Sequence, residues 1–241
     1  MFFEKDNLSR FDFISIKEFL LALFLMFVST LFIFLYIPYL LQRILPAYKE
    51  LFRSHYFNIF LLLLSSLLTF YIIYYFCCIR KQKSFKNGLF FNPKSIKIIL
   101  ISVLLGIIVP LVTLPVIFKF APHEFYAMDL AREKGGLVYL FCAAVFAPIF
   151  EEIFYRGFIF PFFQSKLNSF WAIIITSLFF GFSHFMNIGN AHILLSLFIF
   201  YGFVLTLIRY FTNSLIPPVI THFFHNVTLM ISFLAMSYSN Q

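Results

Sequence analysis

The sequence predicts an all-α fold, a polytopic transmembrane helical bundle of seven or eight spans. Three observations lead to this prediction. Hydrophobic residues make up 62% of the 241 residues and charged residues only 12%, whereas a soluble domain is typically about half apolar and roughly a quarter charged. Several apolar stretches reach the length of about 20 residues that a helix needs to cross the hydrocarbon core. The ionisable residues inside such stretches are confined to the C-terminal half of the chain.

Seven apolar stretches follow one another along the chain. They are Phe19–Leu41, Tyr56–Ile79, Ile98–Phe118, Leu137–Phe163, Phe170–Met186, His192–Ile208 and Leu215–Met236. The first follows a segment with charges of both signs and precedes no small-residue cleavage site, so we expect an uncleaved span rather than a signal peptide. Two prolines are expected to break the third. The fourth is long enough to turn or to hold an additional half-span, which would make eight segments.

The basic residues predict the orientation of the chain. The net charge is +8, and six basic residues lie between two apolar stretches with no acidic residue among them: Arg80, Lys81, Lys83, Lys86, Lys94 and Lys97. Because cytoplasmic loops carry an excess of Lys and Arg, we place this segment and the N-terminus in the cytoplasm and, with seven spans, the C-terminus outside. We expect a multi-pass protein of the inner membrane of a bacterium. No basic face with polar surroundings suggests nucleic-acid binding.

The polar residues divide the chain into two parts. Residues 1–136 form an N-terminal membrane region with three spans and a basic cytoplasmic loop, and their spans are nearly free of ionisable groups. Residues 137–241 contain Glu151, Glu152, Arg156, His184, His222, His225 and Asn226 within apolar stretches. Ionisable groups inside a bilayer cost about 2.5–3.5 kcal/mol each on insertion scales, so they indicate function by default. We therefore expect these residues to gather at one buried site.

The first polar motif contains two adjacent glutamates. On a helix, Glu152 and Arg156 are four residues apart and share a face, so they can form an ion pair. Glu151 points about 100° away from Glu152 and is left free to face a cavity, where it would suit the role of a general base. A structural ion pair at a helix end remains the alternative for this motif.

Two further motifs carry histidines. His184 ends an apolar stretch and could simply donate a hydrogen bond to a carbonyl group. His222 and Asn226 are four residues apart on one helical face, where two donors could stabilise an oxyanion or hold helices together by hydrogen bonds. His225 points in another direction and would reach water or a carbonyl group.

Taken together, the motifs resemble those of a known family. Glu151-Glu152-Ile153-Phe154-Tyr155-Arg156, Phe180-Gly181-Phe182-Ser183-His184 and His222-Phe223-Phe224-His225-Asn226 follow one another on successive apolar helices. This pattern resembles the CAAX protease and bacteriocin-processing (CPBP, or Abi) family of intramembrane endopeptidases, over roughly Leu137 to Met236. The first three spans match only as generic hydrophobic helices.

The resemblance implies a role for each motif residue. Glu151 and His184 would activate a water molecule for attack on a peptide bond, and His222 and Asn226 would bind the oxyanion. Glu152 and Arg156, with Phe180, would support the site. The substrate would be a membrane-associated protein or peptide, prenylated at a CAAX-type C-terminus or bearing a leader. We expect a glutamic-type protease without a required metal; a zinc enzyme, the alternative, would use Glu151, His184 and His222, although the usual His-Glu-x-x-His motif is absent.

Two other functions remain open at this point. A transporter or proton relay would use the same buried Glu and His residues strung out across the membrane, and an inactive relative would serve as a membrane scaffold or immunity protein. A protease requires Glu151, His184, His222 and Asn226 to converge on one small cavity, which we expect near the cytoplasmic side.

Overall fold

The structure is a computed structural model, and it describes residues 13–120, 133, 135–185 and 192–239. Every regular element in these ranges is helical, which confirms the all-α prediction. The N-terminal part comprises α1 (Ile16–Leu31), a π-helical turn (Phe32–Tyr36), α2 (Ile37–Ile44), two short 3₁₀ turns (Pro46–Tyr48 and Leu51–Arg53), α3 (His55–Tyr74), a second π-helical turn (Tyr75–Ile79) and α4 (Phe85–Gly88). The C-terminal part comprises α5 (Ile96–Phe120), α7 (Gly136–Val145), α8 (Ala147–Glu152), a π-helical segment (Ile153–Ile159), α9 (Phe160–Lys166), α10 (Ser169–Ser183), α11 (His192–Thr212) and α12 (Ile216–Ser239).

Six helical runs among the described residues are long and apolar enough to cross a membrane. They are Ile16–Ile44, His55–Ile79, Ile96–Ile117, Gly136–Lys166, Ile193–Thr212 and Ile216–Ala235. This number is lower than the seven or eight predicted, because the fifth stretch forms only the 15-residue helix α10. At 1.5 Å per residue such a helix is about 22 Å long, short of the roughly 30 Å hydrocarbon core.

Two local expectations for the spans were wrong. Pro110 and Pro115 do not break α5, which runs through both. The stretch from Leu137 to Phe163 does not turn back on itself. α7, α8, the π-helical segment and α9 instead follow one another as one 31-residue run, Gly136–Lys166, so no additional half-span forms there.

Side-chain caps fix where several helices begin. The Ser15 hydroxyl accepts from the backbone of Glu18, whose carboxylate accepts from the Ser15 backbone, forming a capping box at α1. Ser54 caps α3, and Asn168 caps α10. Each cap satisfies a backbone N–H that has no partner within its own helix.

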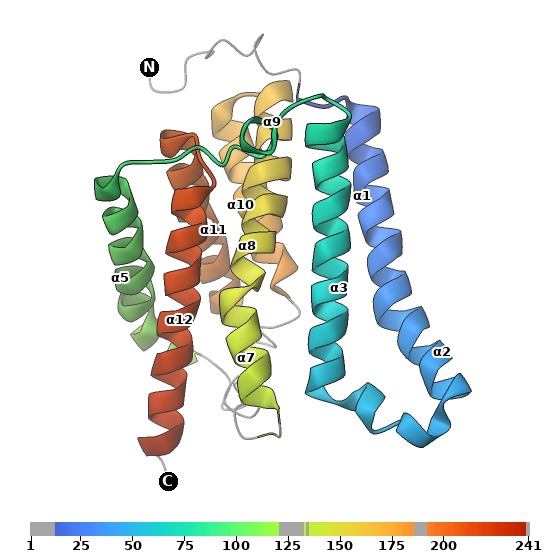
Figure 1. Cartoon of the computed structure of the whole chain (residues 1–241). Coiled ribbons are helices and arrows are strands. Elements are labelled where there is room, and N and C mark those ends of the chain that lie inside the picture. The colour runs from blue at the N-terminus through green and yellow to red at the C-terminus, as the bar shows by residue number, and fades with distance from the viewer. Residues whose placement is uncertain (1–12, 121–132, 134, 186–191, 240–241) are drawn as a thin grey trace.

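The helices pack in neighbouring pairs around the central run that contains α7, α8 and α9 (Figure 1). The α1–α3 hairpin lies on one side of this run and the α5–α12 pair on the other, while α10 packs against both α9 and α11. The start of α1 and the end of α12 lie at opposite ends of the bundle.

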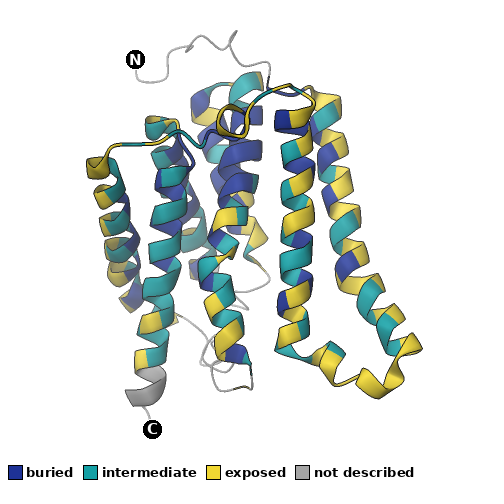
Figure 2. Cartoon of the chain, viewed as in Figure 1, coloured by how far each residue is buried: buried dark blue, intermediate teal, exposed yellow. Residues whose placement is uncertain are grey.

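Burial is uneven along the bundle (Figure 2). The largest buried cluster joins α1 and α3 to the C-terminal half of the central run. It contains, among others, Phe19, Ile73, Ile153, Phe158 and Phe162. The predicted N-terminal region and the predicted catalytic core thus share one packed interior.

Candidate active site

The two glutamates of the first motif occupy different environments. Glu152 is fully buried, and its Oε1 lies 2.8 Å from Nη1 of Arg156, the pair that the four-residue spacing predicts. Arg156 is equally buried and also donates to the Gly202 carbonyl and the Thr206 hydroxyl. The neighbouring Glu151 keeps 30% of its side-chain surface exposed. Glu152 is therefore fixed between helices by its ion pair, while part of the Glu151 side chain remains exposed.

The helix changes its winding directly after these glutamates. Residues Ile153–Ile159 form a π-helical segment, in which Arg156 lies. π-Helical turns are rare and occur frequently at functional sites. Nothing in the sequence marks this segment, so the placement of Arg156 against both Glu152 and α11 is a finding of the structure.

His222 lies between the two carboxylates. Its Nδ1 is 2.8 Å from Oε1 of Glu152, and its Nε2 is 3.9 Å from Oε2 of Glu151. The guanidinium of Arg156 bonds the same Glu152 oxygen. With Glu152 ionised, His222 Nδ1 must carry the proton of the hydrogen bond, because a carboxylate only accepts. The ring then presents Nε2 to Glu151.

His184 approaches Glu151 from another helix. It follows the last residue of α10, and its Nδ1 lies 2.8 Å from the Phe180 carbonyl oxygen. Since a carbonyl group cannot donate, Nδ1 carries the proton, and Nε2 of the neutral ring has a free lone pair. That Nε2 is 3.9 Å from Oε2 of Glu151. The carbonyl contact was considered from the sequence as a competing role, but here it orients the ring toward Glu151.

Phe180 holds these groups together from one side. Its ring centroid is 4.7 Å from that of His184 and 5.7 Å from that of His222, and the Arg156 guanidinium lies 4.6 Å above it. A buried cation over an aromatic face is stabilised by about 2 kcal/mol. Phe180 is itself almost fully buried, so its contacts fix the relative positions of three elements of the site.

The four predicted site residues line one cavity of about 340 Å³. Glu151, His184, His222 and Asn226 supply its polar groups, together with His225. The rest of the wall is largely apolar and aromatic: Val109, Thr113, Ile117, Ala143, Phe180, Leu194, Leu197, Phe198, Phe200, Tyr201, Leu229 and Phe233. The polar groups thus share one cavity, which is what a hydrolytic site requires.

Glu151 lies close to both histidine rings without a direct hydrogen bond to either. At 3.9 Å, neither histidine Nε2 bonds Oε2 of Glu151 directly, since hydrogen bonds between N and O are about 2.7–3.2 Å long. Oε2 is buried and has no hydrogen-bond partner among the described residues. A water bonded to both Oε2 and His184 Nε2 would donate one hydrogen to each, which is the arrangement of a water activated by two bases.

Sequence reasoning counted His225 among the residues of the buried site but pointed its side chain away from His222 and Asn226, toward water or a carbonyl group, and it did not identify Tyr201. His225 is 91% buried in the same cavity, and its ring stacks on Tyr201 with 3.8 Å between centroids. Tyr201 also contacts His222 edge to face. A hydroxyl group in the apolar stretch of α11 was the only signal in the sequence that could have pointed to Tyr201.

Metal binding requires a closer arrangement. A zinc site places histidine nitrogens and carboxylate oxygens about 2.0–2.2 Å from the ion. Within the described parts of the chain, no three His, Cys, Asp or Glu side chains are arranged as such a set. In the predicted ligand set of Glu151, His184 and His222, each Nε2 lies 3.9 Å from Oε2 of Glu151.

Comparison with known families gives one match, over the part of the chain that holds the cavity's polar groups. Residues 133–228 match the family model described as type II CAAX prenyl endopeptidase Rce1-like. These residues are a CAAX protease-family domain. No curated protein matches the chain, and no solved structure does.

The CAAX protease domain contains Glu151, His184, His222 and Asn226, but not the whole cavity. α5 lies outside the matched residues and contributes Val109, Thr113 and Ile117 to the wall. The polar chemistry therefore lies within the family domain, and part of the apolar wall comes from the preceding span.

Proposed function

We propose that the chain is an intramembrane endopeptidase that hydrolyses a peptide bond of a membrane-associated protein. The family of residues 133–228 suggests a CAAX-type protease. The single observation that carries the proposal for this chain is the convergence of Glu151, His184, His222 and Asn226 on one cavity. A relay across the membrane would need such groups at successive depths, and a scaffold would not need them together.

In the proposed reaction, Glu151 and His184 activate a water between Oε2 and Nε2. Either base removes a proton as the water oxygen attacks the scissile carbonyl carbon. His222 and Asn226, one helical turn apart, then donate to the resulting oxyanion. Because His222 Nδ1 already donates to Glu152, donation from Nε2 requires a ring protonated on both nitrogens. The carboxylates of Glu151 and Glu152 on either side supply the compensating charge.

Glu152, Arg156 and Phe180 are positioning residues in this proposal. The Arg156–Glu152–His222 chain of hydrogen bonds fixes the His222 ring. We propose that hydrolysis needs no metal, and that the substrate has an apolar portion suited to the cavity wall, as in a prenylated CAAX-type or leader-bearing protein.

The proposed membrane topology has seven membrane segments, the six full-length spans and the shorter α10, with the N-terminus in the cytoplasm. The start of α1 and the end of α12 lie at opposite ends of the bundle, which supports an odd number of membrane segments (Figure 1). In this topology α10 ends inside the membrane, which explains why His184 reaches the middle of the bundle. The inner membrane of a bacterium is the proposed location.

The decisive variant is Glu151→Gln, which removes the proposed base but preserves the side-chain shape. We expect purified wild-type protein in detergent to cleave a fluorogenic farnesylated CAAX peptide or members of a lipidated peptide library. Glu151→Gln should lower the rate about 10³-fold, within the roughly 10²–10⁴-fold that general acid–base catalysis contributes. Its thermal stability should be unchanged, because Glu151 makes no direct hydrogen bond among the described residues.

Activity retained by Glu151→Gln would exclude Glu151 as the base. The same assay after dialysis against a chelator tests the metal: full activity supports the glutamic mechanism, whereas loss that added zinc restores supports Glu151, His184 and His222 as ligands.

A further inference from the structure

The active-site cavity occupies one half of the bundle. Glu151 is the middle residue of the 31-residue run Gly136–Lys166. From that depth, the cavity wall continues along the second halves of α5 and α12, the first half of α11, and Ala143 of α7. Figure 1 shows that these segments all lie toward the end of the bundle where α12 ends.

The other half of the bundle is packed. From Glu152 to Phe162 every side chain of the central run is buried except Phe154, which is half-buried. Before Glu151, the same run has mostly half-buried and exposed side chains (Figure 2). Glu151 and His184 keep 30% and 19% of their side-chain surfaces exposed, so access to them comes from the less packed half.

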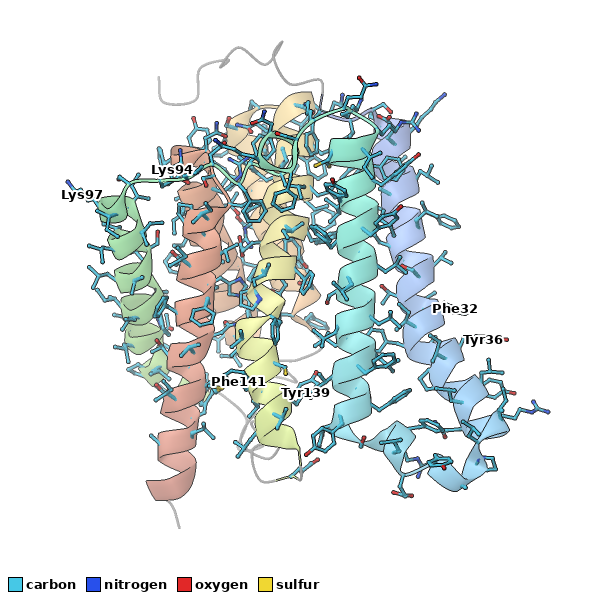
Figure 3. All side chains as sticks on the ribbon, viewed as in Figure 1. Phe32, Tyr36, Lys94, Lys97, Tyr139 and Phe141 are labelled. Atoms are coloured by element: carbon cyan, nitrogen blue, oxygen red, sulfur yellow. The ribbon has the colours of Figure 1, made fainter. Side chains whose placement is uncertain are left out.

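The packed half carries the basic end. Lys94 and Lys97 lie at this end, whereas Tyr139 and Phe141 of α7 lie in the other half (Figure 3). Among described residues the basic end has eight surface cations: Lys17, Arg80, Lys81, Lys83, Lys86, Lys94, Lys97 and Lys166. The opposite end has four: Arg43, Lys49, Arg53 and Lys119. Such an excess of Lys and Arg places the basic end in the cytoplasm.

From these observations we infer that the catalytic cavity faces the outer leaflet, and that the substrate is a peptide already carried across the membrane and still tethered there by an apolar segment. The apolar wall of the cavity receives that segment, and the scissile bond meets Glu151 at mid-depth. This position differs from the cytoplasmic side expected from the sequence. The substrate class rests on the proposed function, whereas the position of the cavity does not.

Cysteine labelling in intact cells tests the position directly. The background is Cys142→Ala, which retains the two buried cysteines, Cys77 and Cys78. Ala143→Cys reports on the cavity, Lys97→Cys on the basic end and Lys49→Cys on the opposite end. A small, charged, membrane-impermeant thiosulfonate reagent should label Ala143→Cys and Lys49→Cys in intact cells. It should label Lys97→Cys only after permeabilisation, and the background chain in neither state.

Two results would overturn the inference. The first is that labelling of Ala143→Cys requires permeabilisation, as labelling of Lys97→Cys does. The second is that Lys97→Cys is labelled in intact cells, which would mean that the orientation is reversed. Cleavage provides a second readout: sealed right-side-out vesicles should cleave the farnesylated peptide several-fold faster than inverted vesicles, and detergent should abolish the difference. Faster cleavage by inverted vesicles contradicts the inference but not the proposed function. Absence of cleavage even in detergent contradicts the proposed function, and the labelling then still decides the position.

Discussion

At the scale of single residues, the site depends on a buried cation balancing a buried anion. Glu152 and Arg156 are both fully buried and 2.8 Å apart. Desolvating two charges is expensive, so such a pair is weak support for stability as a whole. Removing one partner is a different matter, because the other charge is left uncompensated in an apolar interior.

Arg156→Ala should therefore destabilise the protein as well as inactivate it. We expect a loss of about 3–5 kcal/mol of folding free energy, measured as a lower unfolding temperature and yield in detergent. Lys166→Ala, which removes an exposed cation from the end of the same run, is the matched control and should have no effect.

A double variant separates charge from packing. Glu152→Gln/Arg156→Met leaves no unpaired charge and should recover most of the stability lost in Arg156→Ala, while activity stays low because the His222 ring loses its anionic partner. Normal unfolding temperature in Arg156→Ala would contradict the structural role of the ion pair.

At the scale of helices, the position of α12 decides where His222 and Asn226 lie. Gly106 of α5 faces α12 so closely that a β-carbon would lie 2.6 Å from the Thr221 carbonyl oxygen and 2.7 Å from Cβ of Phe224. Small residues at helix interfaces allow such close approach in membranes. The residue that follows Thr221 is His222, so this contact acts directly on the site.

Gly106→Ala should push α12 away from α5 and lower activity. A misplacement of about 1 Å can cost about 100-fold in rate, so we expect a loss of that order in kcat, with a smaller loss of stability. Leu104→Ala on the same helix, whose side chain is 55% exposed, is the control and should keep its activity. Equal activity of the two variants would show that this contact does not position the motif.

At the scale of the whole molecule, the family domain packs against helices that lie outside it. The Phe19 ring of α1 stacks on Phe162 at 3.6 Å and lies 5.1 Å from Phe158. Ile73 of α3 belongs to the same buried cluster. The part of the central run that follows Glu152 is therefore covered by α1 and α3, which lie outside the domain.

The chain from residue 96 to 241 should consequently fail to form a stable protein on its own. Without α1 and α3 it exposes the apolar face around Phe158 and Phe162, and we expect aggregation during size-exclusion chromatography in detergent. Co-expression of residues 1–95 as a separate fragment should restore both a monodisperse peak and peptidase activity. A stable, active 96–241 fragment would contradict the shared interior.

The sequence by itself determined the helical membrane class and the residues of the candidate site. Apolar composition and stretch length predict the spans, because the cost of an unsatisfied backbone in lipid leaves helices as the simplest solution. The placement of Glu151, His184, His222 and Asn226 in apolar stretches predicted one buried site, because ionisable groups inside a membrane are costly. The four-residue spacing of Glu152 and Arg156 predicted their pairing, because it is a property of a single helix.

Tertiary structure alone decided the features that depend on contacts between helices. The short α10, the π-helical segment and the uninterrupted α5 were not predicted, since neighbouring helices compensate for local preferences. Tyr201 and His225 joined the cavity because α11 and α12 pack together. The depth of the cavity and the half of the bundle that it faces depend on how all the helices are arranged. A linear pattern of residues carries no direct record of that arrangement.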